Sequence, residues 1–257
     1  MHSETTNKNC HNTLMKKKKT GFIKRLSKFI GWTLGILVAI SLIEVVVLKW
    51  VPVKITPLMV KRLIEHKDDS SFKSRQQWTS LDKISPNLKK AVVTAEDNHF
   101  AEHNGFDFES IKKSIQQHIE MDKKLRGAST ISQQTAKNVF LLGTGERTKF
   151  QKWLRKAVEA YYTVLIELIW GKERILEVYL NVAEMGDGIY GAEAAAMAHF
   201  GIHASQLTVK QSCLIAACLP NPIRRNAGHP SRYVEVYANT IQRRLNNLIY
   251  PDWFYSK

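Results

Sequence analysis

A single apolar segment near the N-terminus constrains this chain more than any other feature. Residues Phe29 to Leu48 are almost wholly apolar. About 20 residues at a rise of 1.5 Å each match the ~30 Å hydrocarbon thickness of a bilayer. The segment is longer than the core of a cleaved signal peptide, and no small-residue cleavage site is evident. It therefore predicts a transmembrane helix over 29–48.

The charge on the flanks of this segment orients it. The first 28 residues hold eight lysines and arginines and one glutamate, which makes a basic tail. Because positively charged flanks stay in the cytoplasm, we expect a single-pass protein with its N-terminus inside and everything after Lys49 exported. Glu44 is an acid inside the span. It lies near the outer end, where it can snorkel, be protonated or face a partner helix.

Composition narrows the kinds of partner. The 257 residues carry a net charge of +15, and about half of it lies beyond the basic tail. A basic domain suits nucleic acid, anionic lipid headgroups or a phosphate-bearing substrate, and export disfavours nucleic acid. Cys213 and Cys218 are five residues apart in a predicted helix, which turns their side chains away from each other. Without a CxxC pair we expect no disulfide and no metal site.

Helical signals dominate from Ser85 onward, so we predict a mostly α fold. Ser85-Pro86 pairs an N-cap with a proline suited to the first helical position. Further helices are predicted over 108–121 and 153–170, and a capping box at 208–211 opens another that stops at Pro220. We divide the chain into a tail (1–28), the span (29–48), a linker and domain entry with one short helix (49–84) and a main domain (85–257).

A dense polar stretch over 96–107 is the first candidate site. On the helix that starts at Ser85, Glu96 falls at the edge of the apolar face while Asp97 points nearly opposite. Half-burial raises the pKa of a carboxyl group, which makes it a usable base near neutral pH. An isolated glutamate at such a border is usually structural. The nearby His103, Gly105 and Asp107 favour a functional interpretation.

A second polar block lies about twenty residues further on, between Gly127 and Asn138. Residues four apart share a helix face, so this block would line one wall with amides and a cation. Such groups suit sugar hydroxyls and phosphate oxygens. The candidate binding residues here are Ser129, Thr130, Gln133, Gln134, Lys137 and Asn138.

Two further clusters, taken by themselves, are weaker indications of a functional site. Arg155 and Glu159 share a helix face, which taken alone is most often a surface ion pair. Arg147 lies a little upstream and adds positive charge. Asn181 is the polar exception at the end of an apolar, closely packed helix that begins near Arg174.

Together these clusters resemble the glycosyltransferase domain of bacterial peptidoglycan polymerases, the family 51 glycosyltransferases. The matching segments are ED-x-x-F-x-x-H-x-G-x-D (96–107), G-x-S-T-I-x-QQ-x-x-KN (127–138), RK-x-x-E (155–159) and RILE-x-YLN (174–181). GDGIYG (186–191) and LPNP (219–222) continue the match. It covers roughly residues 85–226, and the form around Asn181 looks most like the monofunctional biosynthetic transglycosylases.

The resemblance implies a lysozyme-like α-helical fold with a membrane-touching jaw, anchored in the bacterial inner (cytoplasmic) membrane. Glu96 matches the family's general base and Glu159 its second carboxylate. Lys137 and an arginine match the groups that neutralise a pyrophosphate. That arginine is Arg147 or Arg155, because the spacing between them is longer than usual. Motif positions Asp97, Phe100, His103 and Asn181 complete the expected substrate-binding set.

The expected reaction is inverting glycosyl transfer, which polymerises lipid II into glycan strands and releases undecaprenyl pyrophosphate. We expect no cofactor, and the need for a divalent cation is left open. Besides lipid II, the glycan chain and the membrane, the expected partner is a cross-linking transpeptidase. We also expect an exposed apolar patch between Phe108 and Leu142. The rival interpretations are a lytic, lysozyme-type glycan-cleaving enzyme and a non-catalytic membrane-anchored binding protein.

Overall fold

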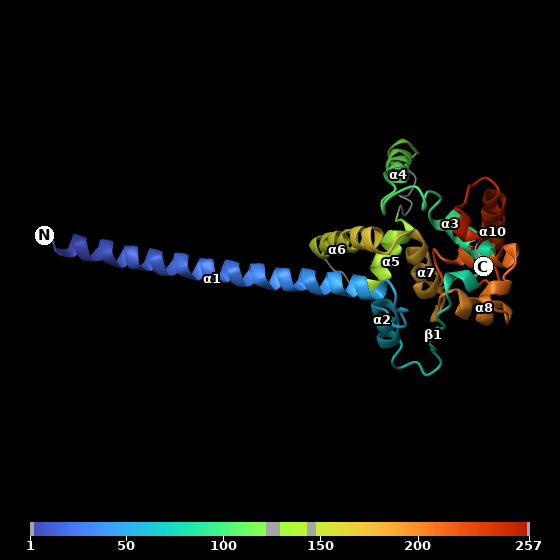
Figure 1. Cartoon of the computed structure of the whole chain (residues 1–257), viewed down its shortest axis with the longest axis horizontal. Helices are drawn as coiled ribbons and strands as arrows, with labels where there is room; N and C mark the ends of the chain where they lie inside the picture. The colour runs from blue at the N-terminus through green and yellow to red at the C-terminus, as the bar shows by residue number, and fades with distance from the viewer. Residues whose placement is uncertain (1–2, 122–128, 143–147, 256–257) are drawn as a thin grey trace. The chain divides into compact units, whose positions relative to one another are not determined.

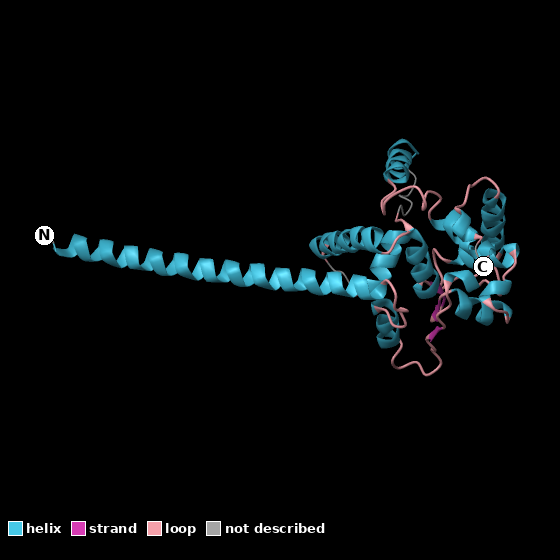
Figure 2. Ribbon diagram, viewed as in Figure 1, coloured by secondary structure: helices cyan, strands magenta, loops and turns pink. Residues whose placement is uncertain are grey.

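The computed structural model describes residues 3–121, 129–142 and 148–255. Within these ranges the regular structure is almost entirely helical, as Figure 2 shows. The predicted mostly α class is therefore confirmed. The chain divides into two compact units, Met1–Val47 and Leu48–Lys257, which are described separately.

The first unit is built by helix α1 (Ser3–Leu48), which is continuous over 46 residues (Figure 1). Its part Lys24–Leu48 has a mean hydropathy of 2.3 and is long and apolar enough to cross a membrane. Large apolar side chains there are exposed all around the helix, with Phe29 at 69% and Trp32 at 75%. A helix that is apolar all round suits lipid better than a one-sided protein core. The basic tail extends the same helix, because lysine is a good helix former and no proline or glycine interrupts 3–20.

The second unit combines helices with one very small sheet. Strands β1 (Arg75–Gln76), β3 (Ile189–Tyr190) and β2 (Glu184–Gly186) lie in the order β1-β3-β2. β1 runs parallel to β3, and β2 runs antiparallel to it with a bulge. The helices are α2 (Pro57–Glu65), η1 (Leu81–Lys83), α3 (Pro86–Glu96), α4 (Phe108–Met121), α5 (Ile131–Phe140), α6 (Lys149–Ile169), α7 (Lys172–Val182), α8 (Ala192–Phe200), η2 (Ala204–Gln206), α9 (Val209–Cys218), α10 (Arg232–Leu245) and η3 (Asp252–Phe254).

The core forms where these helices pack in two groups. α9 packs against both α3 and α10, while α5 packs against both α6 and α7. Leu88 and Val92 of α3, Leu176 of α7 and Ile215 of α9 are fully buried. Full burial of such a side chain stabilises the fold by about 1.5–3 kcal/mol. The two helices that carry the main polar clusters, α3 and α5, are thereby held firmly in place.

The helix starts follow their caps. The Ser85 hydroxyl accepts a hydrogen bond from Asn87 N at 3.3 Å, and α3 begins with Pro86, as predicted. The predicted capping box at 208–211 opens α9, which ends before Pro220. α6 begins at Lys149, four residues earlier than predicted, because Thr148 and its partner Gln151 form a capping box that the periodicity did not reveal.

The segment 49–84, expected to be a linker and domain entry, packs against other elements of the second unit. α2, its one predicted short helix, contacts α5. β1 pairs with β3 from more than a hundred residues further along the chain. Strands of two or three residues leave no alternating pattern long enough to detect in a sequence.

Candidate active site

Helix α3 delivers Glu96 to the edge of a cavity. Glu96 is the last residue of this helix and is half-buried. Gln134 Nε2 donates a hydrogen bond to Glu96 Oε2 at 2.8 Å. Burial raises the pKa of Glu96 above its ordinary value, and the opposing effects of the Gln134 hydrogen bond and the Lys137 charge do not cancel the rise. The expected half-burial is confirmed, while the role of Glu96 as a base stays a prediction.

Asp97 ties the first polar cluster to the second. Its side chain is 1% exposed. Its carboxylate accepts hydrogen bonds from His103 Nε2 at 2.9 Å and from the backbone N–H of Ile131, in the first turn of α5, at 3.0 Å. Gly105 N donates to His103 Nδ1 at 3.1 Å, so the imidazole carries its proton on Nε2. An acid at this position also suits the positive end of the α5 dipole.

The start of α5 uses Thr130 and Gln133 as a capping box. The Thr130 hydroxyl accepts from Gln133 N, and the Gln133 side-chain oxygen accepts from Thr130 N at 3.1 Å. The same hydroxyl donates to Gly105 O at 2.6 Å. Both side chains are buried and occupied by protein partners. A direct contact of either with a substrate stays a prediction that their burial does not favour.

One face of α5 brings an amide and a cation toward Glu96. Gln134 and Lys137 form this pair, whereas Gln133, which lies four residues before Lys137, is taken by the cap. Lys137 is half-buried, and burial lowers its pKa; the neighbouring carboxylates of Glu159 and Glu96 oppose this shift. Asn138, on the following position, is only 9% exposed.

α6 contributes the second carboxylate. Glu159 is 5% exposed on a helix whose neighbouring turns face solvent, and it forms an ion pair with Lys156. Glu159 and Arg155 both act electrostatically on Lys137. Two acids and two cations from three helices therefore share one neighbourhood. Arg147 lies outside the described residues, so the choice between Arg147 and Arg155 stays open.

Phe100 and Asn181 are wholly buried. The ammonium group of Lys172 lies 4.7 Å from the centre of the Phe100 ring. The Asn181 amide donates to Thr79 O at 2.8 Å and accepts from Thr79 N at 2.7 Å. These two side chains hold the domain together, and substrate contact by either is a prediction that their position does not favour.

The cavity beside Glu96 has a volume of about 320 Å³. Asp97, Ser129 and Thr130 line it as well, so the first two polar clusters meet here. Asp107, from the first polar cluster, also lines the cavity, and the structure adds three charged or titratable residues that we had not singled out for the site: His99, Lys113 from α4 and Arg244 from α10. Arg244 stands in the last turn of an amphipathic helix far along the chain, and only the packing of α10 near α3 brings it here.

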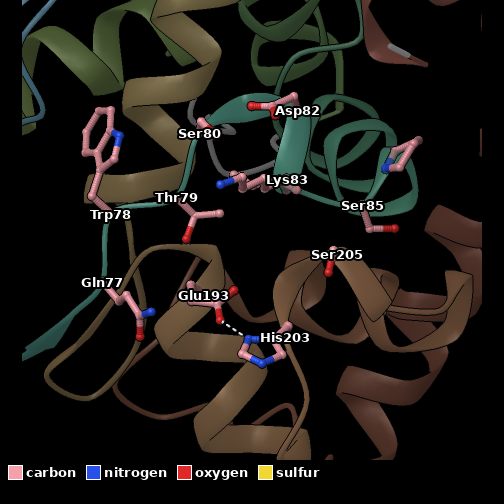
Figure 3. Close-up of a pocket in the computed structure, with 12 residues that line it drawn as sticks. Gln77, Trp78, Thr79, Ser80, Asp82, Lys83, Ser85, Glu193, His203 and Ser205 are labelled. Carbon is pink, nitrogen blue, oxygen red and sulfur yellow. Dashed lines mark hydrogen bonds and ion pairs between the residues drawn. The ribbon is translucent and has the colours of Figure 1, made fainter. Parts of the chain in front are cut away.

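A larger cavity of about 850 Å³ lies at the other end of α3, around Ser85 and Pro86 (Figure 3). Its lining contains none of the predicted site residues. In its lining His203 Nδ1 lies 2.6 Å from Glu193 Oε1. Among the described residues no group of three His, Cys, Asp or Glu side chains is placed to hold a metal ion.

Comparison with known proteins shows which family the chain belongs to. The family model described as transglycosylase matches residues 61–247. The chain belongs to the transglycosylase family. Proteins named biosynthetic peptidoglycan transglycosylase are similar over most of its length. The one from Bacteroides thetaiotaomicron is 48% identical over 225 residues, which cover 87% of this chain and 88% of that protein. The one from Pseudomonas entomophila is 44% identical over 235 residues, covering 91% and 95%.

In this transglycosylase the family match includes all four polar clusters. It also begins at residue 61, inside α2, and so takes in much of the segment that we expected to be a linker and domain entry. The match and the packing of α2 on α5 both join this segment to the domain.

Proposed function

We propose that this transglycosylase is a peptidoglycan glycosyltransferase that polymerises lipid II into glycan strands and releases undecaprenyl pyrophosphate. The names of its relatives support peptidoglycan as the product. The observation that carries the proposal is the half-buried Glu96, held 2.8 Å from Gln134 and within electrostatic reach of Lys137. An acid and a cation placed in this way can accept a proton and stabilise a departing anion.

In the proposed reaction Glu96 takes the proton from the 4-hydroxyl of the acceptor's N-acetylglucosamine. The hydroxyl oxygen attacks the anomeric carbon of the lipid-linked donor from the face opposite the pyrophosphate, and the configuration inverts. The bond between that carbon and the pyrophosphate oxygen breaks, and its electron pair leaves with the pyrophosphate. Burial, which raises the pKa of Glu96, brings its basicity closer to what proton transfer near neutral pH requires.

Lys137 and an arginine stabilise the charge that develops on the leaving pyrophosphate. Arg155 is the described candidate, because it acts on Lys137 electrostatically and lies one helical turn from Glu159. Fixed charges in a site shielded from water stabilise a transition state more than they would in bulk solvent. Glu159 keeps this cluster of cations compensated while no substrate is present.

Specific observations disfavour the rival functions. A lytic enzyme needs an acid and a carboxylate but has no leaving pyrophosphate, so Lys137 and Arg155 would be without a role. A binding protein needs no basic carboxylate, yet Glu96 is held by a dedicated amide donor on another helix.

We also propose that the domain touches the membrane through α6. The α6 face, as we name it, consists of large apolar side chains between 37% and 78% exposed: Phe150, Trp153, Leu154, Tyr161, Val164 and Leu168. Exposed lysines flank it at 149, 152 and 156. An apolar stripe bordered by lysines is typical of helices that lie in the interface of anionic bilayers.

The patch that we expected between Phe108 and Leu142 is described only in part. Among the side chains described in this range, the exposed large apolar ones are Phe108 at 74% and Leu142 at 68%. Leu141 is buried, and Phe140 stacks on Tyr162 of α6 with ring centres 4.3 Å apart. The side chains of Ile115 and Ile119 lie outside the described residues. Phe140 and Leu141 therefore pack within the domain and do not contribute to an exposed patch.

We propose the inner membrane as the location, with the N-terminus in the cytoplasm and the catalytic domain on the outer side, because the lysines precede the span. A transpeptidase must cross-link the strands.

The deciding test of function is incubation of the purified full-length protein with lipid II. Glycan polymer together with undecaprenyl pyrophosphate supports the proposal. Cleavage of isolated glycan strands without polymer would establish the lytic alternative.

A further inference from the structure

Three side chains from three helices form a hydrogen-bonded line that ends at Glu96. Tyr179 of α7 donates through its hydroxyl to Gln134 Oε1 at 3.3 Å. Gln134 of α5 donates through Nε2 to Glu96 Oε2 at 2.8 Å. Tyr179 is 1% exposed, so its hydroxyl faces this line and not solvent.

The direction of this line follows from what each group can donate or accept. The amide nitrogen of Gln134 faces two acceptors, the Glu96 carboxylate and Ser129 O at 3.4 Å. Its oxygen faces a hydroxyl donor. A flipped amide would set oxygen against both acceptors and lose every one of these bonds. Burial raises the pKa of Tyr179 well above its ordinary value, so the tyrosine remains a donor throughout the working pH range.

We infer that Tyr179 is a positioning residue of the proposed reaction, which acts through Gln134 to orient the Glu96 carboxylate. Gln134 occupies Oε2, and among the described residues no hydrogen bond reaches Oε1. The second oxygen is therefore the one left to take the proton from the acceptor hydroxyl. This inference rests on the proposed function, since it assigns Tyr179 a part in that reaction.

Other charged and titratable groups also face Glu96, and the test must separate Tyr179 from them. Those that act on it directly or are perturbed by it are Asp97, Lys137, Arg225 and Tyr237. Across the cavity lie His99, Asp107, Lys113 and Arg244. Replacing Tyr179 by phenylalanine changes none of these charges. It removes one hydroxyl and keeps the ring that fills the core.

The test measures kcat/KM for lipid II polymerisation against pH, using the detergent-solubilised full chain. A Tyr179→Phe variant leaves Gln134 Oε1 without its donor, so the amide is free to turn and Glu96 loses its own donor. A carboxylate that loses a hydrogen bond has a higher pKa, and the acid limb of the profile moves to higher pH. We expect roughly a five- to tenfold loss at neutral pH, the usual worth of one hydrogen bond. The deficit should shrink as the pH rises.

Tyr190→Phe is the matched control. It removes another fully buried tyrosine hydroxyl from the same domain, and the charges around Tyr190 are Glu184, Arg62 and Asp187, not Glu96. Its pH profile should follow that of the wild type. Gln134→Met removes the intermediate amide at similar size and should shift the acid limb as Tyr179→Phe does. It keeps the test decisive if the tyrosine variant does not fold.

The variant that combines Tyr179→Phe with Gln134→Met, compared with the two single variants, gives the sharpest test. If Tyr179 acts through Gln134, Tyr179→Phe has no further effect in the Gln134→Met background. Additive losses, an unshifted acid limb, or a loss that is uniform across pH would overturn the inference while leaving the proposed function intact. A wild-type chain that makes no polymer, or a fully active Glu96→Gln variant, would instead overturn the proposed function and this inference with it.

Discussion

At the scale of single residues, the site separates side chains that hold the structure from side chains that can react. Asp97, Thr130 and Gln133 are each buried and hydrogen-bonded to other parts of the domain. Glu96 and Lys137 are half-buried and lie within electrostatic reach of each other. A polar motif therefore contains both kinds of residue, and only the second kind is expected to control the rate directly.

Replacing Glu96 by glutamine keeps the shape of the side chain and removes its basicity. We expect polymerisation to fall by roughly 10²–10⁴-fold, the usual contribution of a general base, while lipid II binding survives. The wild-type enzyme should lose activity on the acid side at a pH above the ordinary range of a glutamate, because burial raises the pKa of Glu96 and the base must be deprotonated. The glutamine variant should lack this limb. Near wild-type turnover in Glu96→Gln would remove Glu96 from the mechanism.

Replacing Lys137 by alanine removes a charge that faces the proposed pyrophosphate site. We expect kcat/KM to fall by roughly 10²-fold, comparable to loss of one stabilising group in a preorganised site, with partial activity in Lys137→Arg. Parallel assays of Arg147→Ala and Arg155→Ala would show which arginine contributes. If all three alanine variants polymerise lipid II normally, no pyrophosphate clamp exists here.

At the scale of elements, the loop after α3 serves as the platform for α5. Gly105 lies in this loop with φ of +87°, a conformation that favours glycine. A Cβ atom there would come within 2.8 Å of Thr163 Cγ2 on α6. Thr163 in turn donates to Glu159 O at 2.8 Å. The close approach of this loop to α6 thus joins the segment that follows Glu96 to the helix that carries Glu159.

A pair of glycine substitutions isolates this close approach. Gly105→Ala and Gly171→Ala both place alanine at positive φ, which costs about 1–3 kcal/mol, but a Cβ at Gly171 meets no atom within 4 Å. We expect Gly105→Ala to lower the unfolding free energy by about 1–3 kcal/mol more than Gly171→Ala, the usual cost of overpacking. Denaturant unfolding of both variants measures the difference. Equal losses would mean that the loop and α6 adjust without strain.

At the scale of the whole molecule, several features favour binding of the protein to anionic lipid membranes. The basic tail precedes an apolar helix long enough to span a bilayer. The second unit carries the α6 face with its flanking lysines. Each feature acts within its own unit, so each should contribute to membrane affinity independently.

A fragment of residues 48–257 should fold without the span, because it forms a compact unit with its own core. We expect it to float with anionic liposomes and to do so less at high salt, since screening weakens the attraction of the lysines. Trp153→Glu with Leu168→Glu should abolish flotation. Val236→Glu, a change at an apolar residue of α10 that is 57% exposed, should leave it unaffected. A fragment that stays soluble at both salt concentrations would leave the span as the only anchor.

The sequence alone determined the features that depend on neighbours along the chain. The span, the caps at Ser85 and Thr208 and the half-burial of Glu96 follow from composition and from helical periodicity, which are local properties. The order of the four motifs was also sufficient to indicate the family. These inferences needed no knowledge of which helices pack together.

The tertiary structure decided which polar residues remain available. Gln133 caps α5 while Gln134 reaches Glu96, although both belong to the same motif. Phe140 and Leu141 lie against neighbouring helices while the α6 face stays exposed, although all are apolar. Arg244 enters the cavity from the C-terminal part of the chain. Such choices depend on contacts between residues far apart in sequence, and periodicity carries no information about those contacts.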